Sequence, residues 1–349
     1  MPQITALFIQ LSRTSLYNCM KNSTFIFSLF LFFSTTIVYS QSTDEELTNI
    51  FRDAYLSAEK QNYDQAIEKY SNYINLSSFE DSVAIAFYNR GHSYFAISDY
   101  QKAYDDFDTT IAILSNLDSL KKIPRLTSLA FNYRGLCCEN LGMLEEASID
   151  FFISQLSDTT LFQPVFNGAM NCEAREVFDT AIDEYYRAIY LNLKYSNDID
   201  ALLHMLYRAG MLSRKLGNYE NAIQDFEMYL SFDSTDVDVI NKLGNTYASM
   251  KNEEKALSCY LKAIEYNPNF QDAVFNTGVA YLKLGDNSKS IEYIRKAIKL
   301  NDKISDYFKT LGVAMLISNQ KDESVYDFCY QFEKACDLGD CEYFNQYCL

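Results

Sequence analysis

The sequence predicts an all-α protein built from consecutive pairs of helices. Gly210, Gly244, Gly278 and Gly312 lie 34 residues apart, and a fixed period of this length is typical of repeat architectures. Each period contains two apolar stripes at helical spacing, which indicates two helices in each unit. Only 4 Pro and 11 Gly occur among the 349 residues, and a β-sandwich or barrel usually needs more turn residues than that.

The composition argues against several classes of function. The chain carries 30 Lys and Arg residues against 47 Asp and Glu residues, which gives a formal charge of −17. This acidic balance argues against nucleic acid as a partner, because a protein that tracks phosphates needs a basic surface. It argues equally against docking on an anionic membrane surface. The hydrophobic fraction of 48% is ordinary for a globular protein and excludes wholesale disorder.

Residues 1–40 predict a signal segment for export. The run Phe25–Val38 is almost continuously apolar, but its 14 residues are too few for a membrane span of about 20 residues. Lys21 precedes the run and Ser40 follows it, as in a cleavable secretory signal. Met20 is the more sensible start because it places Lys21 directly before the run, whereas initiation at the first methionine would favour an uncleaved anchor. We expect cleavage after Ser40 and delivery to the periplasm, the cell envelope or the medium, with no membrane insertion of the mature chain.

A linker, residues 41–46, leads into the repeat array, for which we predict the range 47–342, and residues 343–349 form a C-terminal tail. A second small residue follows the repeated glycines twelve positions later, as Ala222 and Ala256 do. This double periodicity marks eight units. They begin near residues 47, 84, 128, 162, 203, 237, 271 and 305.

The fifth unit shows the repeated pattern most completely. It carries Leu206, Gly210, Leu216, Gly217, Tyr219, Ala222 and Phe226. With these residues in register the sequence resembles the tetratricopeptide repeat (TPR) family, and residues Val237–Phe270 are a second good copy. The chain departs from the family in having no Trp, since apolar residues occupy the family's frequent Trp position. The resemblance implies a right-handed superhelix, or solenoid, of about eight helix-turn-helix repeats with a C-terminal capping helix.

The same residues explain why such units would stack. Gly217 can adopt the left-handed conformation that ends a helix. Gly210 and Ala222 are expected to face each other where the two helices cross, because small residues let the backbones approach closely. Two helices this short cannot bury both apolar stripes alone, so their stability must come from stacking on the next pair.

The last unit departs from the pattern. Its aromatic and small residues reappear as Phe332 and Ala335, four residues late relative to the other units. One extra helical turn keeps the same face inward, so we expect a longer final helix that ends near Gly339. This segment would cap the open end of the array, which a repeat protein needs for solubility.

The cysteines leave two interpretations open. The C-terminal ones are Cys329, Cys336, Cys341 and Cys348. No pair has the CxxC spacing, so zinc-ribbon and thioredoxin-like patterns are absent. In an exported chain, a disulfide from Cys336 or Cys341 to Cys348 could staple the cap, or these residues could be small buried thiols. Buried thiols are predicted for three cysteines on helical stripes: Cys138, Cys172 and Cys259.

No catalytic or cofactor motif is found. GxGxxG, GxxxxGK[ST] and HExxH are all absent, and neither His92 nor His204 lies beside a cysteine in the sequence. The acidic residues are scattered along helix faces that we predict to be solvated, as Asp105, Asp106 and Asp108 are. The sequence therefore predicts a protein that is not an enzyme and that has no cofactor and no metal site.

The resemblance also implies a binding surface, a concave groove lined by the first helix of each repeat. Asn side chains there can hydrogen-bond an extended peptide, and Tyr, Arg and Met are favoured at interfaces. The predicted groove residues are Tyr88, Asn89, His92, Tyr133, Asn167, Tyr207, Arg208, Met211, Asn241, Asn245 and Asn276. The clamp by which some family members hold a C-terminal carboxylate is absent from the last three repeats, where Asp306 and Thr310 replace its cations.

The leading hypothesis is an exported, non-enzymatic scaffold or adaptor that binds a protein or peptide partner in this groove. An alternative is a TPR-type protein of the cell envelope that binds glycans, similar to the starch-binding outer-membrane lipoproteins. Those proteins carry a lipidated Cys after the signal and large insertions, and this sequence shows neither. A third hypothesis is an enzyme whose site is assembled from scattered acidic residues.

Overall fold

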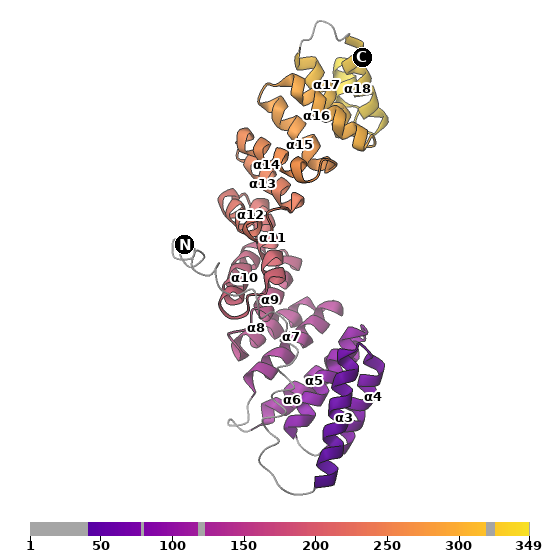
Figure 1. Ribbon diagram of the computed structural model, residues 1–349, viewed down its shortest axis with the longest axis vertical. Coiled ribbons are helices and arrows are strands. Elements are labelled where there is room, and N and C mark those ends of the chain that lie inside the picture. The colour runs from indigo at the N-terminus through magenta and orange to yellow at the C-terminus, as the bar shows by residue number, and fades with distance from the viewer. Residues whose placement is uncertain (1–40, 78–79, 118–122, 319–324, 349) are drawn as a thin grey trace. The chain divides into compact units, whose positions relative to one another are not determined.

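The computed structural model describes residues 41–77, 80–117, 123–318 and 325–348 (Figure 1). In these ranges every regular element is a helix, which confirms the predicted all-α fold. None of the described helices is both long enough and apolar enough to span a membrane. The predicted signal segment, residues 1–40, lies outside the described part of the chain.

The chain divides into two compact units. The first extends to Val177 and also includes Tyr190–Asp198. Its described helices are α3 (Gln41–Glu59), α4 (Tyr63–Leu76), α5 (Glu80–Ala96), α6 (Tyr100–Asn116), α7 (Pro124–Asn140), α8 (Leu144–Ser157), α9 (Gln163–Ala174) and the π-helix η1 (Asn192–Ser196). From α3 to α9, consecutive helices pack against one another.

The second unit comprises Phe178–Ile189 and Ile199–Leu349. It holds most of α10 (Phe178–Leu191), followed by α11 (Ile199–Lys215), α12 (Tyr219–Phe232), α13 (Val237–Ser249), α14 (Glu253–Tyr266), α15 (Gln271–Lys283), α16 (Asn287–Leu300), α17 (Ser305–Ser318), α18 (Val325–Asp337) and α19 (Glu342–Tyr347). Along the described sequence the helices α3–α18 form eight consecutive pairs, and α19 follows them. The predicted array of about eight helix-turn-helix repeats with a C-terminal helix is confirmed.

The turn inside a pair depends on one residue in the left-handed conformation. Gly217 has φ +81° between α11 and α12, and the N–H of the next residue, Asn218, donates to the carbonyl of Ser213 at 2.8 Å. This bond satisfies a carbonyl that the end of α11 would otherwise leave without a partner. Lys251 takes the same conformation between α13 and α14, with φ +60°. The turn geometry therefore recurs even where glycine does not.

The repeated glycine makes room for an aromatic ring. A Cβ on Gly210 would lie 2.8 Å from the ring of Phe226, and on Gly244 it would lie 2.5 Å from the ring of Tyr260. The side chain nearest to Gly210 is thus Phe226 rather than Ala222, which the sequence suggested. The second helix places its aromatic residue, one turn after that alanine, over the glycine of the first helix, where the ring is fully buried.

Asp106, Asp150 and Asp225 are buried, each directly before the aromatic residue of its second helix. The burial of Asp106 corrects the prediction that it lies on a solvated helix face. Asp106 is 4% exposed, and Arg90 donates to its two carboxylate oxygens at 2.8 and 2.7 Å. Arg134 binds Asp150 in the same bidentate way, at 2.9 and 2.6 Å. Asp105 and Asp108, by contrast, are exposed as predicted. The ion pair explains the difference, because a buried carboxylate is tolerated when a guanidinium satisfies it.

The last helices differ from the prediction in two ways. α18 has 13 residues, so it is not longer than the 14-residue α16. The disulfides are Cys329–Cys348 and Cys336–Cys341, so the expected pairing of Cys336 or Cys341 with Cys348 is wrong.

The course of α19 explains this pairing. The chain turns at Gly339, with φ +102°, directly after α18, and the short turn brings Cys336 and Cys341 together. α19 then returns along α18, so that Tyr343 and Tyr347 pack against the ring of Phe332, at centroid distances of 5.4 and 6.2 Å. Phe332 is thereby covered at the end of the array.

Candidate functional site

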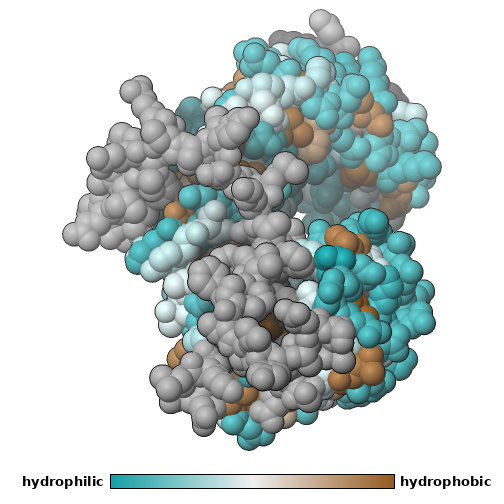
Figure 2. Space-filling model, turned by 60° about the horizontal axis from the view of Figure 1, so that its bottom comes forward, coloured by the Kyte–Doolittle hydropathy of each residue, from teal (hydrophilic) through white to brown (hydrophobic). Residues whose placement is uncertain are grey.

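The candidate site is the face of the first helices that carries the predicted groove residues, which we call the first-helix face. In the first unit it is lined by α5, α7 and α9, and in the second unit by α11, α13 and α15. The surface shown in Figure 2 is mainly hydrophilic, with separate apolar patches. We describe the two parts of the first-helix face in turn.

In the first unit, an aromatic cluster occupies the face of α5 and α7. The ring of Tyr133 stacks on Phe107 at 5.5 Å and meets His92 edge-on at 5.1 Å. Tyr88 is buried beneath Tyr133, with 6.0 Å between their ring centroids. The prediction that Tyr88 lines an open groove is therefore wrong, because a side chain of the next repeat covers it.

Burial also sets the ionisation of this cluster. It lowers the pKa of His92 and raises the pKa values of Tyr88 and Tyr133. All three rings are therefore neutral at neutral pH. Asn89, the neighbour of Tyr88, is half-buried beside the hydroxyl of Tyr70. This part of the face offers apolar ring surface rather than charge.

An amide pair links α7 and α9. The side-chain nitrogen of Asn167 donates to the side-chain oxygen of Asn132 at 2.8 Å. Both residues are buried, so the prediction that Asn167 lines an open groove is wrong. Asn167 therefore joins two consecutive first helices.

In the second unit, three predicted residues form a hydrogen-bonded amide cluster across α13 and α15. The side-chain nitrogen of Asn276 donates to the side-chain oxygens of Asn241, at 3.0 Å, and of Asn245, at 3.1 Å. The hydroxyl of Tyr260 donates to the same oxygen of Asn245 at 2.8 Å. The cluster leaves the amide oxygen of Asn276 and the amide nitrogen of Asn245 without a protein partner among the described residues, and both side chains are half-buried. Asn241 is only 1% exposed, so the prediction that it lines an open groove is wrong.

Tyr260 belongs to this cluster although it is not one of the predicted groove residues. Its ring fills the space over Gly244 as Phe226 does over Gly210, but the hydroxyl at the end of the ring reaches Asn245. The residue that corresponds to Asn245 in the preceding repeat is Met211. The sequence therefore contained a signal for this contact. One repeat has a tyrosine and an asparagine where the preceding repeat has a phenylalanine and a methionine.

The three predicted residues of α11 lie in a different environment. The hydroxyl of Tyr207 donates to Asp238 at 3.2 Å, and its pKa is raised, chiefly by burial and then by that carboxylate. Met211 packs with Tyr207 against the apolar core of this repeat. Arg208 is half-buried. Tyr207 and Met211 thus contribute to packing as well as to the face.

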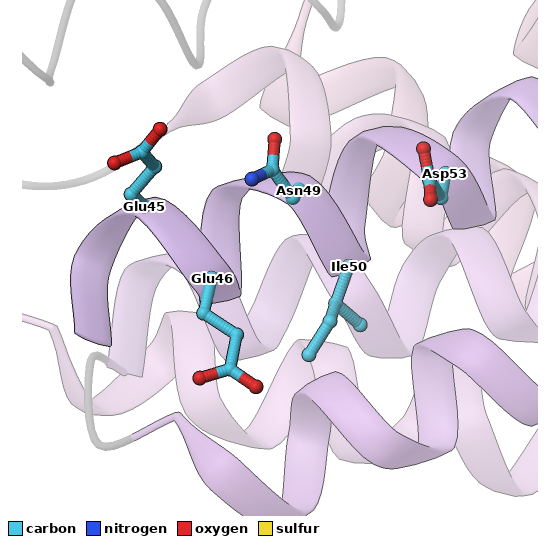
Figure 3. Close-up of a pocket in the computed structure, with 5 residues that line it drawn as sticks. All are labelled: Glu45, Glu46, Asn49, Ile50 and Asp53. Atoms are coloured by element: carbon cyan, nitrogen blue, oxygen red, sulfur yellow. The ribbon is translucent and has the colours of Figure 1, made fainter. Parts of the chain in front are cut away.

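A shallow pocket lies apart from the first-helix residues named above. It encloses about 380 Å³ along α3 and is lined by Glu45, Glu46, Asn49, Ile50 and Asp53. Figure 3 shows Glu46 and Ile50 on one side of the helix and the other three side chains on the opposite side. Its polar side chains are acidic or neutral, and all five residues come from a single helix.

The described residues do not assemble a catalytic centre of a familiar kind. No group of three or more His, Cys, Asp or Glu side chains in the described ranges is placed to hold a metal ion. Burial raises the pKa of Cys137 to about 12 and that of Cys138 to about 11, so both are protonated, non-nucleophilic thiols at neutral pH. Cys138 is buried as predicted, whereas Cys172 and Cys259 are half-buried.

Family models identify the repeats directly. The model described as "Tetratricopeptide repeat" matches residues 203–236 and 272–304, and the model described as "TPR repeat" matches residues 244–285. The chain contains TPR repeats. The matched segments overlap α11–α16, and the helix pairs α3/α4, α5/α6 and α7/α8 repeat the same architecture in the first unit. A comparison with curated protein sequences finds no match.

Several solved structures of TPR proteins are similar to parts of this chain. A tetratricopeptide repeat protein from Parabacteroides merdae is 16% identical, with a TM-score of 0.47 over 75% of this chain and 96% of the other. YrrB, described as a TPR protein with an unusual peptide-binding site, is 19% identical, with a TM-score of 0.44 over 50% of this chain and 87% of its own. MamA is 20% identical, with a TM-score of 0.45 over 52% and 94%. TPR proteins generally act as scaffolds for protein–protein interaction and are generally not catalysts.

Proposed function

We propose that this TPR protein is an exported, non-catalytic adaptor that holds an extended segment of a protein partner on its first-helix face. The observation that carries the proposal is the amide cluster of Asn241, Asn245 and Asn276. It presents one free acceptor, on Asn276, and one free donor, on Asn245. A peptide backbone supplies the complementary N–H and C=O groups, so these two side chains can anchor it without regard to its sequence.

The cluster is fixed before any partner arrives. Three hydrogen bonds hold the amides of Asn245 and Asn276, and the ring of Tyr260 that supplies one of them is itself buried. A side chain that is already ordered loses little conformational entropy on binding, so more of each new hydrogen bond contributes to affinity. The half-buried rings of His92 and Tyr133 supply apolar contact area in the first unit.

The proposal of export rests on the pattern of residues 1–40 and is supported by the cysteines of the last repeat. Cys329–Cys348 and Cys336–Cys341 form where α19 folds back on α18. Disulfides persist in oxidising compartments and are rare in the cytosol. We place the protein in the periplasm, the cell envelope or the medium. Amino-terminal sequencing of the purified protein tests this, and a chain that begins at Gln41 is the expected result.

Site-directed photocrosslinking in the native compartment tests the adaptor function. A photoreactive residue in place of Val279, one turn from Asn276, should capture a defined protein. The same residue in place of Ser258, exposed on α14, is the control. Equal capture at both positions, or capture at Ser258 alone, would show that the first-helix face is not the binding surface.

The captured partner then allows a quantitative measurement. Asn276→Ala should weaken its binding about tenfold, because the variant loses the free acceptor and the bonds that fix Asn245. Asn269→Ala, an exposed asparagine outside the cluster, should leave the Kd unchanged. An equal Kd for the two variants argues against the amide anchor. A glycan array probed with the same variants separates this function from the glycan-binding alternative.

A further inference from the structure

The outer face of α8 carries a row of exposed apolar side chains that we call the α8 stripe. Ile149, Phe152 and Leu156 are 59%, 60% and 65% exposed. Their spacing of three and four residues places them on one side of the helix. Single exposed apolar residues are normal on a protein surface, but a contiguous row on one helix is typical of an interaction site.

Stacking of the repeats does not require this row to be apolar. The corresponding positions, counted from the small residue of each second helix, are not all apolar in α4, α6, α12, α14 or α16. In three of these helices they are Glu68, Ser71 and Asn75; Gln224, Glu227 and Ser231; and Glu292, Arg295 and Lys299. The third repeat therefore exposes three apolar side chains at positions where these three helices carry polar ones.

The sequence segment that contains the stripe is acidic. Every charged residue between Arg134 and Arg175 is an acid: Glu139, Glu145, Glu146, Asp150, Asp158 and Glu173. Glu145 and Glu146 are exposed in the first turn of α8, at one end of the stripe, and Asp158 caps the other end.

The neighbouring helix α6 adds to this charge. Arg134 reaches Asp150 on α8 and Asp108 on α6, so the two helices lie side by side at this point. Its single positive charge is shared by two carboxylates, and Asp105 on the same face of α6 is exposed. The stripe is therefore rimmed by a net negative charge.

We propose that the α8 stripe is a second interaction surface, which binds a cationic amphipathic helix of another protein. Apolar side chains at positions i, i+3 and i+7 of that helix would pack on Ile149, Phe152 and Leu156, and flanking Lys or Arg residues would meet the acidic rim. A second copy of this chain fits less well, because it would bring the same acids against this rim and both copies carry a net negative charge. An anionic lipid surface is disfavoured for the same reason.

A synthetic peptide of Leu and Lys, about 18 residues long with Leu at helical spacing, is the probe. The protein is used with its natural amino-terminus, and binding is measured by fluorescence anisotropy at several salt concentrations. We expect saturable binding that weakens as salt rises. A peptide with the same Leu pattern and Glu in place of Lys should bind about tenfold more weakly or not at all.

The first variant removes the stripe. Replacing Ile149, Phe152 and Leu156 together by Ser should weaken peptide binding about tenfold or more. The matched control replaces three exposed apolar residues of other helices, Leu76, Ile317 and Tyr330, by Ser. Circular dichroism and the denaturant midpoint check that both triple variants fold.

The second variant reverses the charge at one end of the α8 stripe. The double variant Glu145→Lys with Glu146→Lys should bind the Lys peptide more weakly and the Glu peptide more tightly than the wild type does. The control, Glu45→Lys with Glu46→Lys on α3, should leave the binding of both peptides unchanged. The proposal is overturned if the stripe variant binds the Lys peptide as tightly as the control variant does, or if both peptides bind equally. It is also overturned if sedimentation shows that the wild type is a dimer and the stripe variant is a monomer, because the stripe would then bind a second copy of this chain.

Discussion

A buried aspartate stands at the same place in the repeats of both units, but each unit compensates its charge differently. In the first unit, Asp106 and Asp150 each receive two hydrogen bonds from an arginine on the first helix of the pair. In the second unit the equivalent aspartate is Asp225, which is 6% exposed. The first helix offers only Ala209 at the arginine position. The hydroxyl of Tyr186, on α10, donates to Asp225 at 2.9 Å instead.

A residue on the second helix of the preceding repeat explains why tyrosine can replace arginine. Arg90 also contacts Ser71 at 2.9 Å, and Arg134 also contacts Asp108 at 2.5 Å. Tyr186 occupies the position that corresponds to Ser71 and Asp108 in the repeat order. The tyrosine therefore supplies the hydrogen bond from the preceding repeat where the arginine of the aspartate's own repeat is missing.

The arginine–aspartate pair and the tyrosine–aspartate pair differ in charge. Burial raises the pKa of Asp106, but the adjacent Arg90 opposes the shift. No cation opposes it at Asp225, where burial raises the pKa to about 7 and the hydrogen bond from Tyr186 offsets this only in part. The difference teaches that a hydroxyl can satisfy the geometry of a buried carboxylate without compensating its charge.

The largest expected effect comes from breaking the arginine pair. Arg134→Ala leaves Asp150 buried without a cation, and we expect a loss of about 3–5 kcal/mol in the stability of the first unit. Denaturant unfolding, combined with hydrogen exchange in α7 and α8, measures it. The double variant Arg134→Ala with Asp150→Asn should recover most of the loss. Lys102→Ala, which removes an exposed partner of Asp99, should have no measurable effect.

The next effect is a gain. Asp225→Asn should stabilise the second unit by on the order of 2–4 kcal/mol at pH 8, because the amide accepts the hydrogen bond of Tyr186 without carrying a charge. In the wild type, the folded carboxyl titrates at about 7 and the unfolded one near 3.8. The folded state therefore holds the proton more tightly. The cost of ionisation is absent below about pH 4, grows between about pH 4 and 7, and is complete above pH 7.

The measurement for this prediction is hydrogen exchange of α10 and α12 in both proteins at pH 5 and pH 8, after correction for the intrinsic exchange rates. The stability difference between wild type and Asp225→Asn should grow with pH. A difference that is the same at both pH values would mean that Asp225 is ionised over the whole range. The corresponding Asp106→Asn variant in the first unit is the comparison, and it should destabilise because it leaves Arg90 without its anion.

The repeat order could be predicted from sequence because it depends on local signals that recur. The spacing of Gly210, Gly244 and Gly278 marks where each first helix crosses the second, and the array follows from it. The turn at Lys251 shows how far such signals extend, because its left-handed conformation is carried by a lysine that no turn rule selects. The fold there is fixed by stacking rather than by the turn residue.

The candidate site was harder to predict because contacts between repeats decide it. Tyr88 and Tyr133 were both predicted to line the groove, but Tyr133 covers Tyr88, which is buried. Asp106 looks like part of a solvated face until Arg90 is placed beside it in space. The disulfide partner of Cys348 depends on how α19 returns along α18. Four cysteines allow three pairings, and the sequence does not distinguish them.

The smallest expected change in stability comes from building the arginine–aspartate pair of the first unit into the second unit. Ala209→Arg alone should destabilise by about 1–3 kcal/mol, because the ring of Tyr186 occupies the space beside Asp225 and the core is overpacked. With Tyr186→Ser as well, the arginine has the same neighbours as Arg90, an aspartate and a serine, and the net change at pH 8 should be within about 1 kcal/mol of wild type. The pH dependence attributed to Asp225 should disappear, because a guanidinium keeps the carboxylate ionised in the folded state. If hydrogen exchange in α12 still shows a loss of stability between pH 5 and 8 in the double variant, the missing arginine is not the reason for the difference between the two units.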